Sequence, residues 1–269
     1  MQDNIFFEVK DMIPNVLSFS ESLKKFCTDE KSFIRIGDGE YNLIFNNINI
    51  FEHKNEKLGN SIYKILNNDN DSINIGIADN FPYSSFNMLV LKNAYLSNWL
   101  KSWHVRLKQY MLYMKEHNMN LFSMKKQYLN VSIFSPYHSL DSDIIDIGDV
   151  FTQIKKVFRN KDIILVTGDP YFKKYKDNEN VFNEAKSLEI YDTPSKGSFQ
   201  LYDTFLNDLK KTNGKLICMA CGPCGKVLAY ELQTNYGIRC IDTGHLMRDY
   251  HRFVNKIVPF SPEDKMYYD

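Results

Sequence analysis

The second half of the chain alternates between short apolar stretches and helical stretches, and this alternation strongly limits the folds open to it. Strand-like runs are predicted at 128–134, 162–167, 188–191, 215–220 and 238–242. Helical patterns are predicted at 150–158, 180–186, 199–211, 225–234 and 246–253. Strands that alternate with helices of this length form a mostly parallel sheet with helices on both faces. We therefore predict an α/β fold of the Rossmann-like kind.

The first half of the chain extends this pattern. Further strand-like runs lie at 32–36 and 72–78, and a helical pattern at 14–27 begins at a proline. Aromatic-rich helical stretches at 86–117 are interpreted as an insertion. No repeat or Pro/Gly/Ser-rich linker interrupts the chain, and 269 residues is close to the size at which one hydrophobic core stops growing. A single domain, 1–269, is the favoured organisation.

Charge and hydropathy exclude several classes of function. Lys plus Arg and Asp plus Glu both total 33, so no global field would attract nucleic acid. No stretch approaches the roughly 18 apolar residues of a membrane span, and the N-terminus lacks the pattern of a signal peptide. We expect a cytoplasmic protein, with a peripheral contact at the inner membrane face left open. Oligomeric state is not indicated by the sequence.

Two acidic residues follow the early strand at 32–36. Asp38 and Glu40 flank Gly39, whose flexible backbone lets both carboxylates converge on one point. Mg²⁺ and Mn²⁺ are commonly held by one or two carboxylates together with the phosphates of a nucleotide. Arg35, on the preceding strand, could bind a phosphate. The alternative is a plain turn from strand to helix at Gly37, with the carboxylates capping the helix.

Four motifs in a fixed order resemble those of the GT-D-type glycosyltransferases. They are R-x-G-D-G-E at 35–40, G-D-P at 168–170, a Gly-Pro turn at 222–223 and D-x-G-H at 242–245. The resemblance runs from about Phe33 to Phe253. It implies a Rossmann-like fold, Mn²⁺ or Mg²⁺ held by Asp38 and Glu40, and transfer of a hexose from a UDP-sugar to a glycan or glycosylated protein. This sequence departs from the family where a glutamate-bearing run is expected at 167–170, and in the cysteines around the Gly-Pro turn.

Further candidate residues follow the other predicted strands, because parallel sheets bind ligands at the carboxyl ends of their strands. For the nucleotide donor these are Gly37, Gly39, Gly168, Asp169, Lys196, Gly222 and Pro223. Gly222 and Pro223 start a helix whose free N–H groups suit a diphosphate. Asp242 or His245 could activate the acceptor hydroxyl, or could merely cap the following helix.

The cysteine motif offers a competing interpretation. Cys221-Gly-Pro-Cys224 matches the active-site sequence of thioredoxin-like thiol-disulfide oxidoreductases, but it follows several βα units rather than one early strand. Cys218 extends the motif to C-x-x-C-x-x-C, which invites a zinc or iron–sulfur interpretation. A non-catalytic nucleotide-binding module is the third alternative. The glycosyltransferase interpretation is favoured over all of these.

Overall fold

The computed structural model describes residues 7–47, 49, 51–78, 94–174, 179–259 and 261–267. Its centre is an eight-stranded sheet in the order β1-β4-β3-β2-β8-β7-β5-β6. The strands are β1 (Asn15–Val16), β2 (Ser32–Ile36), β3 (Ile73–Ile77), β4 (Gln127–Asn130), β5 (Asp162–Thr167), β6 (Ser187–Asp192), β7 (Leu216–Ala220) and β8 (Cys240–Asp242). Every neighbouring pair is parallel, which confirms the predicted α/β class.

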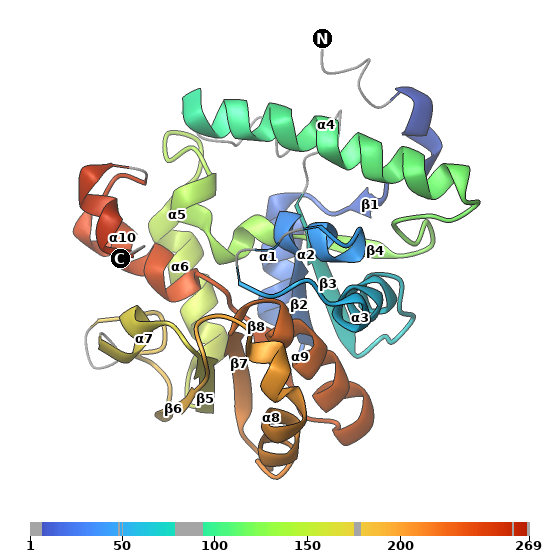
Figure 1. The fold of residues 1–269 in the computed structure, drawn as a ribbon. Helices are drawn as coiled ribbons and strands as arrows, with labels where there is room; N and C mark the ends of the chain where they lie inside the picture. The colour runs from blue at the N-terminus through green and yellow to red at the C-terminus, as the bar shows by residue number, and fades with distance from the viewer. Residues whose placement is uncertain are drawn as a thin grey trace.

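Helices cover both faces of the sheet (Figure 1). The α-helices are α1 (Phe19–Thr28), α2 (Asp38–Ile44), α3 (Glu56–Leu66), α4 (Ala94–Glu116), α5 (Pro136–Ser139), α6 (Ile147–Phe158), α7 (Pro170–Lys174), α8 (Tyr202–Leu209), α9 (Gly222–Tyr236) and α10 (Leu246–Asn255). Short 3₁₀ helices are η1 (Phe7–Met12), η3 (Val131–Phe134), η4 (Ser198–Leu201) and η5 (Pro262–Tyr267).

The direction of each crossover decides which face its helix covers. Connections that step toward β1 in the strand order carry α3, α4, α8 and α9, and these helices belong to one hydrophobic cluster. Connections that step toward β6 carry α1, α6 and α7, and these pack in a second cluster. This is the outcome that right-handed crossovers require. In the view of Figure 1, α3, α8 and α9 lie to the right of the sheet and α6, α7 and α10 to the left.

Three predicted elements were wrong in detail, each because a side chain bonds to its own local backbone. No helix begins at Pro14; β1 lies there, and α1 is instead started by Ser18, which forms a capping box with Glu21. The strand predicted to reach residue 134 ends at Asn130, whose side chain accepts from Ser132 N and starts η3. Residues 180–186 form turns rather than a helix, since Asn180 Oδ1 accepts from Phe182 N at 2.8 Å.

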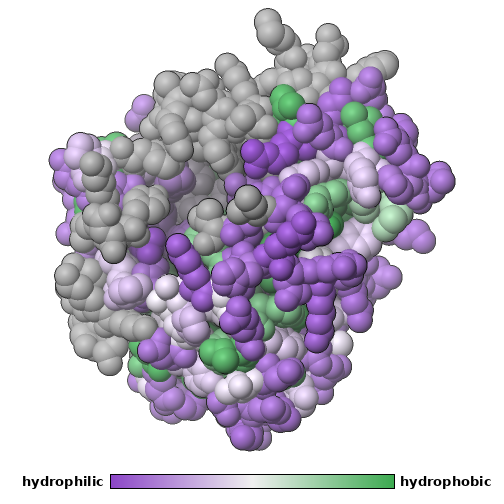
Figure 2. Space-filling view, in the orientation of Figure 1, coloured by the Kyte–Doolittle hydropathy of each residue, from purple (hydrophilic) through white to green (hydrophobic). Residues whose placement is uncertain are grey.

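The predicted helical insertion at 86–117 is represented by α4, while 86–93 lies outside the described residues. Among the helices of the described ranges, none combines the length and apolarity that a membrane crossing requires. On the face shown in Figure 2, the described surface is mainly hydrophilic, with apolar residues in small separate patches.

Candidate active site

The candidate site lies where the sheet changes winding direction, between the neighbouring strands β2 and β8. The segment after β2 enters α2, whose Tyr41 and Leu43 pack in one hydrophobic cluster. The segment after β8 enters α10, whose Leu246 and Met247 pack in the other. Because these connections leave to opposite faces, the carboxyl ends of the two strands form a topological switch point, the position at which open α/β sheets bind ligands.

The acidic turn directly follows β2. Gly37 is the N-cap of α2, and its N–H donates to Glu40 Oε2 at 2.8 Å. Asp38 Oδ1 accepts from Gly39 N at 2.9 Å. Asp38 is exposed, whereas Glu40 is only 9% exposed. Desolvation and then the neighbouring charge of Glu40 raise the pKa of Asp38. Glu40 can therefore cap the start of α2 while the exposed Asp38 binds a ligand.

Lys226 of α9 connects the acidic turn with the end of β8. Its Nζ lies 3.0 Å from Asp242 Oδ2 and 3.3 Å from Glu40 Oε1, and Lys226 and Asp242 are each 3% exposed. Burial alone would lower the pKa of Lys226, but the two carboxylates outweigh it and raise that pKa. Lys226 was not among the residues predicted from sequence. A signal was present, since this lysine lies among apolar and small residues, and 223–229 are all buried.

Arg35 completes the network from the β2 side. Its Nε lies 3.4 Å from Asp242 Oδ1, and its backbone N–H donates to Asp242 Oδ2 at 3.2 Å. Burial would raise the pKa of Asp242, but Lys226 and Arg35 together hold that pKa below its usual value. Asp242 is therefore a firmly ionised carboxylate with both oxygens engaged. This suits a positioning group better than a proton acceptor.

Gly244 gives the Arg35 guanidinium its space. A Cβ at Gly244 would stand 1.7 Å from Arg35 Nη2, and the φ of Gly244 is +47°, which also favours glycine. His245 follows as the N-cap of α10 and is exposed. Desolvation by the surrounding protein, and then the charge of Arg35, lower the pKa of His245. The pKa falls from 6.5 to about 3, so the imidazole is neutral near pH 7.

The N-terminus of α9 lies on the same edge. Cys221 is its N-cap, and Gly222 takes a φ of +65°. A Cβ on Gly222 would approach Phe51 Cβ to 3.3 Å, so the segment around residue 51 lies directly beside this helix start. Pro223 in the first turn has no N–H to leave unsatisfied. The remaining free N–H groups of this turn suit an anion.

Asn49 links the acidic turn to the segment beside α9. Its Nδ2 donates to Gly39 O at 2.9 Å, and its Oδ1 accepts from Phe51 N at 2.8 Å and Glu52 N at 3.1 Å. Glu52 in turn accepts from Phe199 N, at 3.1 Å to Oε1. Neither Asn49 nor Glu52 was among the residues predicted from sequence, because irregular segments carry no periodic pattern.

The candidates after β5 and β6 lie on loops that pack together. A Cβ on Gly168 would stand 2.3 Å from Pro194 O, so only glycine allows this approach. Asp169 forms an ion pair with Arg248 of α10 and accepts from Tyr171 N at 2.9 Å. Lys196, in the second loop, is exposed and forms no ion pair within the described ranges. Asp169 is thus engaged in holding α10, whereas Lys196 is available to a ligand.

The buried thiols do not fit the oxidoreductase interpretation. All five cysteines are free, and Cys218, Cys221 and Cys224 are buried. Burial raises the pKa of Cys221 to about 12 and raises the pKa of Cys224 further. A redox-active thiol needs a lowered pKa and access to solvent, so these cysteines act as core residues.

The carboxylates of the acidic turn fit a divalent cation in type. Asp38 and Glu40 supply the hard oxygen ligands that Mg²⁺ and Mn²⁺ prefer. Across the part of the chain that the structure describes, no group of three or more His, Cys, Asp or Glu side chains is placed to hold a metal. A cation here would therefore take its other ligands from substrate phosphates and water, as Mg²⁺ usually does.

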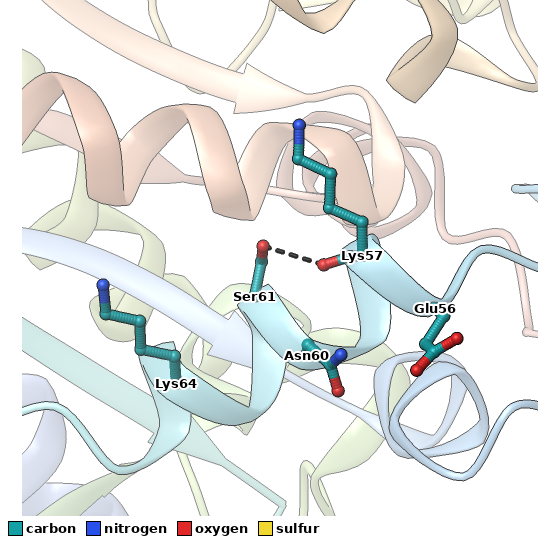
Figure 3. Close-up of a pocket in the computed structure, with 5 residues that line it drawn as sticks. All are labelled: Glu56, Lys57, Asn60, Ser61 and Lys64. Atoms are coloured by element: carbon teal, nitrogen blue, oxygen red, sulfur yellow. Dashed lines mark hydrogen bonds between the residues drawn. The ribbon is translucent and has the colours of Figure 1, made fainter.

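A depression on the surface of α3 lies apart from the candidate site at the ends of β2 and β8. Figure 3 shows a shallow depression lined by residues of α3 alone: Glu56, Lys57, Asn60, Ser61 and Lys64. Ser61 Oγ donates to Lys57 O at 2.9 Å, which is a bond within the helix. None of the residues predicted to be functional borders this depression, and we assign it no role in catalysis.

Comparisons with known proteins show which family and fold the chain resembles. The profile of the family described as "Glycosyltransferase GT-D fold" matches residues 33–261. The protein named glycosyltransferase GlyD, from Streptococcus pneumoniae, is 22% identical over 88% of this chain and 27% of its own length. A probable glycosyl transferase Gly of Streptococcus gordonii is 23% identical over 89% of this chain and 33% of its own length. The chain thus spans about a third or less of these two relatives.

A solved structure extends the match to three dimensions. It is described as the highly conserved domain of unknown function 1792, with a distinct glycosyltransferase fold. The identity is 25%, the match covers 94% of both chains, and the TM-score is 0.75. The fold that the motifs predicted is therefore confirmed.

Proposed function

The chain belongs to the family of glycosyltransferases with the GT-D fold, and from this premise we propose that it transfers a hexose from a UDP-sugar to a glycan or glycosylated protein. The observation that carries the proposal is the network of Arg35, Asp242, Lys226 and Glu40 at the border of β2 and β8. It holds two carboxylates and two cations at the point where doubly wound sheets bind nucleotides. The same edge carries the free N–H groups of α9.

In this proposal the donor diphosphate lies between α9 and the acidic turn. The N–H groups at the start of α9 and the exposed Lys196 bind phosphate oxygens. Asp38 and Glu40 would hold Mn²⁺ or Mg²⁺, and the bound ion would supply positive charge to compensate the leaving diphosphate. Arg35 and Lys226 keep Asp242 ionised and fixed in place.

His245 is the proposed proton acceptor. Its imidazole is exposed and neutral, and it follows β8 at the same edge as the acidic turn. The acceptor hydroxyl oxygen would form a bond to the anomeric carbon as the bond from that carbon to the diphosphate oxygen breaks. The hydroxyl proton passes to the imidazole. This leaves UDP, the glycosylated acceptor and a protonated His245, which returns its proton to water.

Thermal unfolding with nucleoside diphosphates tests the donor site. Ligand at 100 times its dissociation constant stabilises the protein by about 2.7 kcal/mol, or several degrees for a chain of this length. We expect a shift that requires both UDP and Mn²⁺ and that is lost in Asp38→Ala. The matched control is Asp149→Ala, which removes an exposed carboxylate from the first turn of α6 on the opposite face of the sheet. A shift retained in Asp38→Ala would contradict the metal assignment.

Turnover separates an enzyme from a non-catalytic nucleotide-binding module. Release of UDP during prolonged incubation with UDP-sugars and glycan acceptors supports the transferase. Binding of UDP with no release of product from any UDP-sugar would favour the binding module.

We also propose a cytoplasmic location for the protein. The protein and its nucleotide-sugar donor must be in the same compartment for the donor to reach the site.

A further inference from the structure

Part of the negative charge at the acidic turn is already balanced by the protein itself. Within the described network, the carboxylates of Glu40 and Asp242 face the cations of Lys226 and Arg35. Asp38 is the carboxylate of this turn that forms no ion pair with a described residue, and it is exposed. The turn therefore offers an incoming cation about one net negative charge rather than the two that its sequence suggests.

We propose that Lys226 is a resident counter-ion for Glu40, so that a divalent cation enters this site together with the donor diphosphate and not before it. The inference rests on the proposed function, since it concerns the cation of that same site. Without the diphosphate, a cation that approaches Glu40 meets an ammonium group 3.3 Å from the carboxylate oxygen it would need. Like charges at such distances repel strongly when water is largely excluded.

The diphosphate changes this balance in two ways. Its negative charges offset Lys226, and its oxygens supply the ligands that the described residues lack. Lys226 itself need not move, because its Nζ stays 3.0 Å from Asp242, while the side chain of Glu40 turns toward the cation. A lysine that is 3% exposed has no route to solvent, and it holds its place whether or not Glu40 is paired with it. Lys226 is thus a positioning residue.

Direct measurement of Mn²⁺ binding, by the electron paramagnetic resonance signal of the free ion, tests this order. For the wild-type protein we expect weak binding of Mn²⁺ alone and an affinity at least about tenfold higher when UDP is present. In Lys226→Met, Glu40 is released from its counter-ion, so Mn²⁺ alone should bind about tenfold more tightly than to the wild type. Lys226→Arg keeps the positive charge and should retain the dependence on UDP.

A second variant guards against a folding defect. Lys226→Met leaves buried carboxylates without their cation, whereas Lys226→Met combined with Asp242→Asn removes one charge of each sign and frees Glu40 in the same way. Unchanged binding of Mn²⁺ alone in both variants, with UDP still raising the Mn²⁺ affinity of the wild type, would overturn the inference while leaving the proposed function intact. Equal Mn²⁺ affinity of the wild type with and without UDP would overturn the inference and, because such coupling is reciprocal, would also contradict the metal-dependent donor site. Absence of Mn²⁺ binding with UDP in every protein would refute the donor site itself.

Discussion

Glu52 should make the stability of this protein fall as the pH rises through neutrality. The residue is buried, and its carboxylate accepts from Phe199 N, which ties the segment beside α9 to the loop after β6. Desolvation raises the pKa of Glu52 from 4.5 to about 7. Glu52→Gln removes the titratable group. The glutamine side chain has nearly the same shape as glutamate and keeps an oxygen that can accept the hydrogen bond from Phe199 N.

The size of the effect follows from the shift. A carboxyl group whose pKa is raised on folding binds its proton more tightly in the folded protein. Its contribution to stability is complete below pH 4.5 and is lost as the pH rises through about 7. Each pKa unit corresponds to about 1.4 kcal/mol, so the full shift corresponds to about 3 kcal/mol. Solvent screening of a group near the surface reduces this to about 1–2 kcal/mol.

Urea denaturation from about pH 5 to about pH 8 measures this difference. The wild type should lose about 1–2 kcal/mol relative to Glu52→Gln across this range. Asp249, whose pKa is also raised to about 7 by burial, is present in both proteins and cancels in the comparison. Glu56→Gln changes an exposed carboxylate nearby and should track the wild type. Parallel stability curves for the wild type and Glu52→Gln would mean that the Glu52 carboxyl group does not cause this pH dependence.

Three further substitutions test the packing around the site and the redox alternative. Gly244→Ala places a Cβ 1.7 Å from Arg35 Nη2, so we expect a stability loss of about 1–3 kcal/mol and a weaker UDP-dependent thermal shift. Cys221→Ser should keep transferase turnover, because a thiol with a pKa of about 12 supplies almost no thiolate at neutral pH. Gly59→Ala places a Cβ 2.3 Å from Leu43 O, which should push α2 from α3 and cost about 1–3 kcal/mol in urea denaturation.

Control substitutions show whether a steric clash causes the expected losses of stability. Gly214 has a φ of +75°, and no atom lies within 4 Å of the place that a Cβ would take there, so Gly214→Ala reports backbone strain without a clash. Asn60→Ala changes an exposed neighbour of Gly59 on α3. If Gly214→Ala costs as much as Gly244→Ala, contact with Arg35 is not the cause. Loss of turnover in Cys221→Ser with the fold intact would reopen the redox interpretation.

The central strands could be predicted from sequence because their signal is local. β2 and β5 have the predicted bounds, since a buried parallel strand is a short continuous run of apolar residues. The errors lie where a polar side chain competes for the backbone, as Asn130 and Asn180 do. Side-chain caps of this kind are visible in the sequence only as single residues, so periodicity cannot find them.

The candidate site was partly predictable for a related reason. Asp38 and Asp242 were predicted as candidates because one follows a strand and the other ends one, and the structure brings both to the same edge of the parallel sheet. Lys226 was missed because a lysine in a helix is ordinarily a surface residue. Its role depends on β2 and β8 becoming neighbours, which places Asp242 and Glu40 on either side of its ammonium group. Periodicity reports which face of a helix is buried, and it does not report the contact between Lys226 and Glu40, which lie in distant parts of the chain.

The place of β8 in the sheet has a consequence for synthesis of the chain. This three-residue strand is made after the other seven, yet it lies in the middle of the sheet between β2 and β7. Until it leaves the ribosome, β2 and β7 cannot be joined through it, and each presents an unpaired edge to the cell. Contacts between such distant parts of a chain form slowly and expose the nascent protein to aggregation. Chaperone dependence in cells should therefore be governed by the arrival of residues 240–242 more than by any earlier part of the fold.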